Sequence, residues 1–114
     1  MTASRRIATF REFWPYYVRE HQAPGCRALH FVGTTLALLC LLALLVTGNW
    51  WWLLAAPLAG YGTSWIGHFA IEHNQPAAFR YPLWSLAADA KMWLLMIAGR
   101  MGREVEAVSS AAAQ

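Results

Sequence analysis

The chain has 114 residues, of which 58% are hydrophobic and 13% are charged, and its formal net charge is +3. The charged fraction is about half that of an average soluble domain, so the composition argues against a soluble globular protein and favours one domain in a membrane. The basic residues cluster at the ends of apolar segments and form no nucleic-acid-binding motif. The charge therefore indicates a lipid bilayer with anionic headgroups as the partner and excludes nucleic acid.

The N-terminal part of the chain predicts a surface helix followed by a turn. Residues 9–20 mix aromatic side chains with arginines, as in an amphipathic helix at a bilayer surface. Residues 1–27 contain no secretory apolar core, so we expect the next apolar segment to be a mature span and not a cleaved signal. A proline and a glycine within residues 23–25 predict a turn that would bring His21 beside His30.

Two apolar segments predict a transmembrane hairpin. Residues 29–46 are long enough to span a bilayer, and residues 53–71 form the second span. The uncharged connection carries three tryptophans at 50–52, a residue type that gathers at membrane interfaces. Basic residues flank the hairpin at its open end. The positive-inside rule therefore predicts that both termini are cytoplasmic, in a bacterial-type inner membrane.

The C-terminal part predicts one further helix and a tail. Residues 82–99 form a third apolar helix, but Asp89 lies in its middle. Three placements stay open for this helix: it spans the membrane, lies at the interface, or covers the polar layer described next. Residues 104–114 are rich in alanine and serine without a core-forming pattern and predict a disordered tail. The predicted fold is an all-α integral membrane bundle with a single domain over residues 1–103.

Polar side chains appear where the second predicted span ends. In an α-helix His68 and Glu72 lie on one face, about 40° apart. The same row contains Ala56, Gly60 and Ser64, small residues that let membrane helices approach closely. The pair is either two metal ligands facing a partner helix or the end of an ordinary packing face.

The hairpin topology predicts where the other histidines lie. His30 is at the start of the first span and His68 is at the end of the second, so antiparallel helices place them at one depth. His21 and Glu72 belong to the same layer. Because ionisable residues at membrane depth are costly and often functional, we favour a site built from these four residues over a packing role.

Several motifs stand near these residues: Glu20-His21, Pro24-Gly25-Cys26-Arg27, Leu29-His30-Phe31-Val32-Gly33-Thr34, Trp65-Ile66-Gly67-His68-Phe69 with Glu72, Asn74 and Pro76, and Tyr81-Pro82 with Ser85-Leu86. With these motifs the chain resembles the small membrane proteins typified by the fungal 2-hydroxy fatty acid dioxygenase of α-oxidation. The resemblance covers roughly residues 10–100.

The resemblance implies an iron(II), or Fe(II), enzyme that uses O2 to shorten a 2-hydroxy fatty acid by one carbon and releases CO2. His21, His30 and His68 match the histidines of the family and are the expected metal ligands. Glu72 is expected as a fourth ligand or as a partner of a ligand. His73 departs from the family pattern, in which a basic residue such as lysine is commoner, and is not included in the site.

Two arginines flank the predicted spans and are weaker candidates. Arg27 and Arg80 are suited to bind a substrate carboxylate, since a guanidinium can do so through two hydrogen bonds. The alternative is ordinary anchoring at the interface.

Two other classes of function stay open from the sequence. A haem-binding electron carrier would use His30 and His68 as axial ligands from facing helices. A structural or assembly protein would use the histidines only for hydrogen bonding. A zinc protease is excluded, because the segment from His68 to His73 has one residue too many for the HxxEH motif.

Overall fold

The computed structural model describes residues 6–113, and these residues form helices and turns without a strand. The elements are α1 (Phe10–Arg19), α2 (Pro24–Thr47), α3 (Trp51–Ile66), the π-helix η2 (Gly67–Glu72), the 3-10 helix η3 (Ala77–Phe79), α4 (Pro82–Ile97) and α5 (Met101–Ala113). The all-α prediction is confirmed over this range. Residues 1–5 of the predicted domain, and Gln114, lie outside the described residues.

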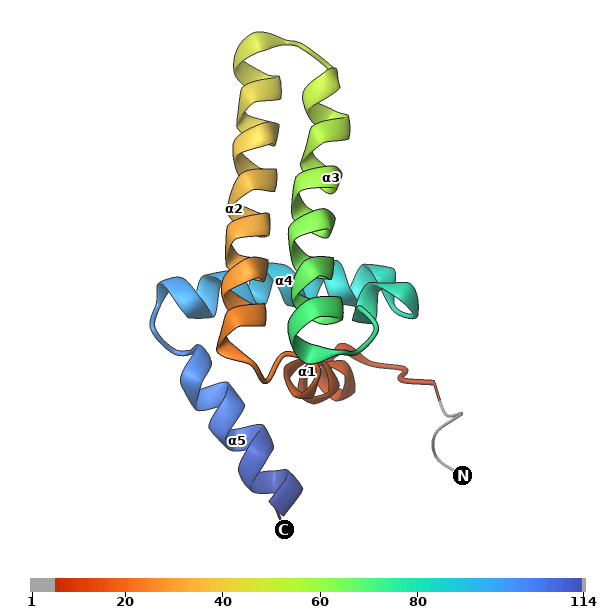
Figure 1. The fold of residues 1–114 in the computed structure, drawn as a ribbon, viewed down its shortest axis with the longest axis vertical. Helices are drawn as coiled ribbons and strands as arrows, with labels where there is room; N and C mark the ends of the chain where they lie inside the picture. Colours follow the sequence, from red (N-terminus) through yellow and green to blue (C-terminus); the bar gives the residue numbers. More distant parts are fainter. Residues whose placement is uncertain (1–5, 114) are drawn as a thin grey trace.

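The helices α2 and α3 form a tall hairpin, and the other helices, α1, η3, α4 and α5, form a broad base that we call the foot. Figure 1 shows α2 and α3 side by side, with α4 crossing the lower part of the hairpin and α1 lying beneath it. The third predicted helix is therefore α4, and it lies across the foot of the hairpin instead of running parallel to it. Of the placements left open by the sequence, covering the histidine layer matches this arrangement.

The two hairpin helices approach closely through small residues. A side chain built at Gly33 would place its Cβ 2.8 Å from the carbonyl oxygen of Gly60, so a larger residue at Gly33 would push the helices apart. Ala56 and Ser64 are buried in α3 on the same row as Gly60. The predicted small-residue row therefore packs against α2. This contact sets the helix spacing from which the histidines project.

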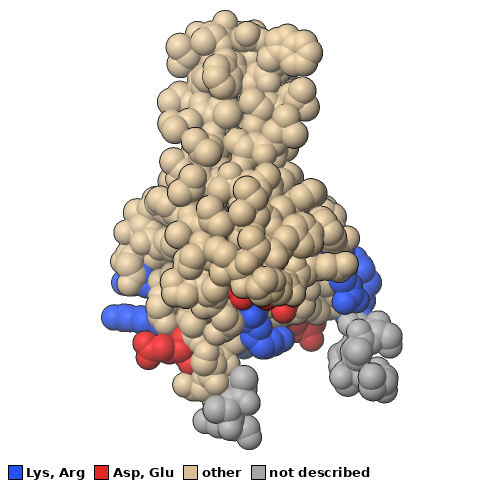
Figure 2. Space-filling model, viewed as in Figure 1, with Lys and Arg blue, Asp and Glu red and all other residues tan. Residues whose placement is uncertain are grey.

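The hairpin has an apolar surface. No charged residue occurs from 28 to 71, and Figure 2 shows the charged side chains gathered around the foot on the visible face. Within residues 6–113, α2 alone is long and apolar enough to cross a membrane, with a mean hydropathy of 2.4. The second predicted span is α-helical for only 16 residues. One such helix is weak evidence, so insertion of the hairpin stays a prediction.

The main buried core lies in the foot and not in the hairpin. Four residues of α1 are buried there, and they pack with residues of η3, α4 and α5: Phe13, Trp14, Tyr17, Val18, Ala77, Tyr81, Ala88, Met92 and Met101. The amphipathic helix predicted at 9–20 is thus present. Its apolar face, however, is covered by protein, because α4 and α5 pack against it.

The C-terminal segment differs from its prediction. Residues 104–114 were expected to be disordered, but residues up to Ala113 belong to α5. Met101, Val105 and Val108 recur at helical spacing and pack on the foot core. The indole Nε1 of Trp14 also donates a hydrogen bond of 2.7 Å to Glu104. These three apolar residues form a stripe on one face of an otherwise alanine-rich segment, and α5 is stabilised because α1 covers that stripe.

Candidate metal centre

Three separate elements bring three histidines together. His21 follows α1, His30 lies in the second turn of α2, and His68 lies in η2. Their side chains are 1%, 3% and 1% exposed. One ligand atom from each lies within 4.8 Å of the others. The structure therefore places His21, His30 and His68 at one level, as the hairpin topology predicts.

The three imidazole rings face one another nearly at right angles. The ring centroids are 4.4 Å apart for His21 and His30, 4.5 Å for His21 and His68, and 4.8 Å for His30 and His68. The interplanar angles lie between 79° and 88°. Such rings do not stack on each other. Their edges converge instead.

Each histidine is held through its Nδ1 atom. The Nδ1 of His21 lies 2.6 Å from the carbonyl oxygen of Tyr17, and that of His30 lies 2.9 Å from the carbonyl oxygen of Cys26. The Nδ1 of His68 lies 2.7 Å from Oδ1 of Asn74. Since carbonyl oxygens only accept hydrogen bonds, each Nδ1 carries the proton and donates it. Each Nε2 then presents a lone pair.

The orientation of the Asn74 amide is itself determined by a second contact. Its Nδ2 donates a hydrogen bond of 3.1 Å to the carbonyl oxygen of Glu20. The amide oxygen must therefore face His68. Asn74 links the ligand in η2 to the end of α1, next to His21.

The arrangement fits a metal ion. The Nε2 atoms of His21 and His30 are 3.0 Å apart, yet with both Nδ1 atoms protonated neither Nε2 has a hydrogen to share. A cation bound to both lone pairs removes this repulsion. Two imidazoles bound at right angles at about 2.1 Å have nitrogens about 3.0 Å apart. Orienting hydrogen bonds to the second ring nitrogen are typical of metal-binding histidines.

Burial keeps His21 neutral. The pKa of His21 is lowered well below its usual value, first by burial and then by repulsion from His30 and His68. A neutral imidazole is the form that binds a metal ion. Burial therefore favours the metal-binding form of His21 at neutral pH.

Glu72 lies outside this group. Its carboxylate accepts a hydrogen bond of 2.7 Å from the backbone N–H of Ala23, at the residue that precedes α2. The sequence analysis placed Glu72 on the face of His68 by assuming an α-helix. The structure instead holds the carboxylate at the start of α2, and the group of possible ligands among the described residues contains the three histidines without Glu72. Glu72 is therefore a cap of the helix that carries His30.

The two arginines and His73 also lie outside the histidine group. Arg27 donates hydrogen bonds of 2.7 and 2.8 Å to the carbonyl oxygens of His21 and Gln22 and so supports the loop before α2. Arg80 is exposed, with its guanidinium 5.8 Å from the centroid of the Tyr81 ring. His73 is exposed and ends η2 with a φ of 59°.

Two residues near the histidines were not assigned to the site from the sequence. The Tyr17 ring stacks on His21 with centroids 4.0 Å apart, and its hydroxyl donates a hydrogen bond to the Asp89 carboxylate. Burial raises the pKa of Asp89 to about 6, against the opposing effect of this hydrogen bond. A lone acidic residue inside an apolar helix was the available signal. From the sequence alone, Asp89 argues only against a membrane span.

Comparison with known proteins gives one match. The family model described as "2-hydroxy-palmitic acid dioxygenase Mpo1-like" matches residues 7–101. No curated protein and no solved structure matches the chain. The matched range contains the three histidines and every contact that orients them.

Proposed function

The chain belongs to the Mpo1-like family, and on this premise we propose that it is an iron(II)-dependent dioxygenase that shortens a 2-hydroxy fatty acid by one carbon. One observation carries the proposal: three buried imidazoles, each with Nδ1 bonded to an oxygen, place one possible ligand atom each within 4.8 Å of one another. Iron(II) accepts imidazole ligands. Three ligands would leave positions for O2 and a substrate.

The overall reaction balances without an external reductant. A 2-hydroxy acid and O2 give the fatty acid shorter by one carbon, CO2 and water. The bond between the carboxyl carbon and the hydroxyl-bearing carbon breaks, the substrate loses four electrons, and O2 takes up all four. Bound iron(II) would supply the redox chemistry that lets O2 react with the acid. The chain itself orients the ligands, keeps His21 neutral and limits access of water.

We further propose that the hairpin lies in a bilayer, with the histidines near the cytoplasmic interface and both described ends of the chain in the cytoplasm. The uncharged stretch from 28 to 71 and the charged foot support this placement. Trp50 and Trp51 are exposed at the far tip, where aromatic residues anchor to an interface. Labelling of single cysteines introduced at residues 8 and 111 tests this topology. If the two cysteines reacted with reagents on opposite sides of the membrane, the proposed topology would be contradicted.

The haem alternative is disfavoured by the spacing of the rings. His30 and His68 lie 4.8 Å apart between centroids, and His21 contacts both. The cavity beside them has a volume of about 10 Å³. A porphyrin would need far more space between its axial ligands. A purely structural role for the histidines is the remaining alternative.

The deciding experiment is metal analysis followed by an activity assay. Protein purified without oxygen is expected to contain about one iron per chain, and to convert 2-hydroxypalmitic acid with O2 into the shorter acid and CO2. A control sample treated with chelator should lose activity and regain it with iron(II). Protein that contains no stoichiometric metal, or that leaves 2-hydroxy acids of every chain length unchanged after iron(II) is added, would contradict the proposal.

A further inference from the structure

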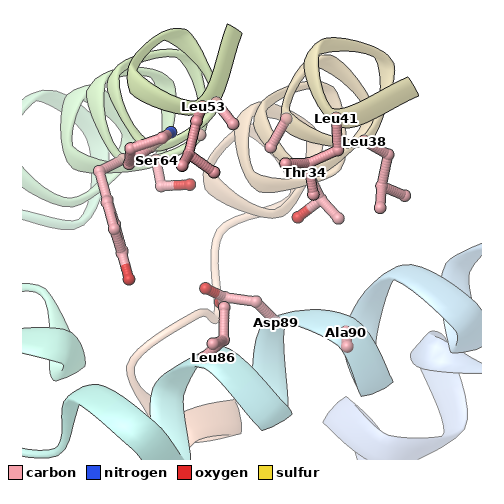
Figure 3. Close-up of a pocket in the computed structure, with 13 residues that line it drawn as sticks. Thr34, Leu38, Leu41, Leu53, Ser64, Leu86, Asp89 and Ala90 are labelled. Carbon is pink, nitrogen blue, oxygen red and sulfur yellow. The ribbon is translucent and has the colours of Figure 1, made fainter. Parts of the chain in front are cut away.

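An apolar groove runs along most of α3, from Leu53 near the tip of the hairpin to Ser64 near the histidines. It has a volume of about 430 Å³ and is lined by residues of α2, α3 and α4, among them Thr34, Leu38, Leu41, Leu53, Ser64 and Asp89. Figure 3 shows the side chains of the two hairpin helices above and those of α4 below. This volume is within the range of pockets for drug-sized ligands.

The groove continues into the histidine site. Tyr61, Ser64 and Asp89 line the groove and also the small cavity that contains His21, His30 and His68. Polar groups thus stand at the end next to the histidines, whereas leucines line the other end. A molecule with an apolar chain and a polar head matches this distribution in one direction only.

The length of the groove suits a long acyl chain. From Leu53 to Ser64 the helix rises by about 16 Å. An extended hydrocarbon chain advances about 1.3 Å per methylene with carbon–carbon bonds of about 1.5 Å. The groove therefore accommodates roughly a dozen methylenes.

A buried hydroxyl without a partner stands at the polar end. Ser85 is 3% exposed, lines the histidine cavity, and its Oγ has no hydrogen-bond partner in the described structure. Buried polar groups are nearly always satisfied, and an exception calls for an explanation such as a missing ligand. Because Ser85 lies beside the histidines and near the groove, the missing partner of its hydroxyl belongs to a ligand of the histidine site.

We propose that the groove holds the acyl chain of the substrate, directed away from the foot, and that the Ser85 hydroxyl hydrogen-bonds its polar head at the histidines. The inference rests on the proposed function and goes beyond it by naming the residues that bind the chain and the polar head of the substrate. The groove is then also a ruler for chain length. Its leucine end determines the longest chain accepted.

A larger side chain at the leucine end of the groove tests whether the groove limits the length of the acyl chain. Leu41 lines the groove and Leu42, its neighbour in α2, does not; they are 39% and 55% exposed. Leu41→Trp should reduce kcat/KM for 2-hydroxypalmitic acid relative to 2-hydroxydecanoic acid by about tenfold or more, the range that small steric changes in apolar pockets produce. Leu42→Trp is the matched control and should leave the ratio unchanged. Equal ratios for both variants would overturn the groove assignment.

Photocrosslinking tests the groove without turnover. A 2-hydroxypalmitic acid analogue with a diazirine near its methyl end should label Leu38, Leu41 or Leu53, and excess unmodified 2-hydroxypalmitic acid should suppress the labelling. Labelling that is not suppressed, or that is equally strong at Leu42 and Leu58, would show ordinary lipid contact and overturn the inference. Suppressible labelling in the groove without conversion of the acid would refute the proposed dioxygenase and leave the binding site standing.

Replacing Ser85 tests the head-group contact. Ser85→Ala removes a hydroxyl that has no partner in the fold, so the melting temperature should not fall. Affinity of the metal-loaded protein for 2-hydroxypalmitic acid, measured by calorimetry without O2, should fall about tenfold. Ser85→Thr, which keeps the hydroxyl, should recover most of it. Unchanged affinity in Ser85→Ala would refute the contact.

Discussion

The Nε2 atoms of His21 and His30 lie 3.0 Å apart although the Nδ1 atom of each ring already donates to a backbone carbonyl oxygen. Two lone pairs at this distance repel each other unless a proton or a metal ion lies between them. This repulsion favours binding of a cation between the two Nε2 atoms.

Removing any one ligand should remove the metal. His21→Ala, His30→Ala and His68→Ala should each lower the iron content of purified protein to near zero, because two remaining imidazoles hold iron(II) weakly. His73→Ala is the control and should retain it, since His73 is exposed and lies outside the group. Metal analysis alone decides the outcome, and full iron content in all three variants would contradict the site.

Asn74 should contribute strongly to metal affinity by orienting His68. Asn74→Ala removes the acceptor for Nδ1 of His68 and the bond to the carbonyl of Glu20. The His68 ring can then rotate, and affinity for the metal should fall about 10- to 100-fold, as is common for such supporting groups. A metal titration measures it, with exposed Gln75→Ala as control. An unchanged affinity would mean that packing alone orients His68.

Glu72 should stabilise the fold without binding the metal. Glu72→Ala deletes the acceptor of the Ala23 N–H at the start of α2, so the free energy of unfolding should fall by about 1 kcal/mol, as for the loss of a helix cap. The iron content should stay near that of the wild type. Loss of metal in Glu72→Ala, with the fold intact by circular dichroism, would instead restore Glu72 as a ligand.

Asp89 should make the stability depend on pH. Its folded pKa is raised from 3.8 to about 6, so its protonated form favours the fold. That contribution is complete below pH 4 and is lost as the pH rises through 6. The free energy of unfolding of metal-free wild type, relative to Asp89→Asn, should therefore fall by up to about 3 kcal/mol between pH 4 and pH 7. Parallel stability curves for the two proteins would contradict this.

The hairpin helices, α1, α4 and the level of the histidines could be predicted from the sequence. Long apolar runs and Pro/Gly turns specify the hairpin, and an antiparallel pair necessarily puts His30 and His68 at one depth. The turn before α2 returns His21 to the same place. The family followed from motifs spread over most of the chain, and the match over residues 7–101 confirms it.

Which side chains face the site depends on how the helices pack together. Gly67 packs so close to Cys26 that a Cβ on it would lie 3.0 Å from the thiol sulfur, and Glu72, at the end of the π-helix η2, accepts a hydrogen bond from the start of α2 and does not join the histidine group. Helical periodicity gives the face of a side chain but not the distant backbone group to which it bonds. Likewise, α5 forms on the surface of α1, and Ser85 and Asp89 reach the histidine cavity because α4 crosses the hairpin. These features depend on contacts between distant segments, which no local pattern in the sequence records.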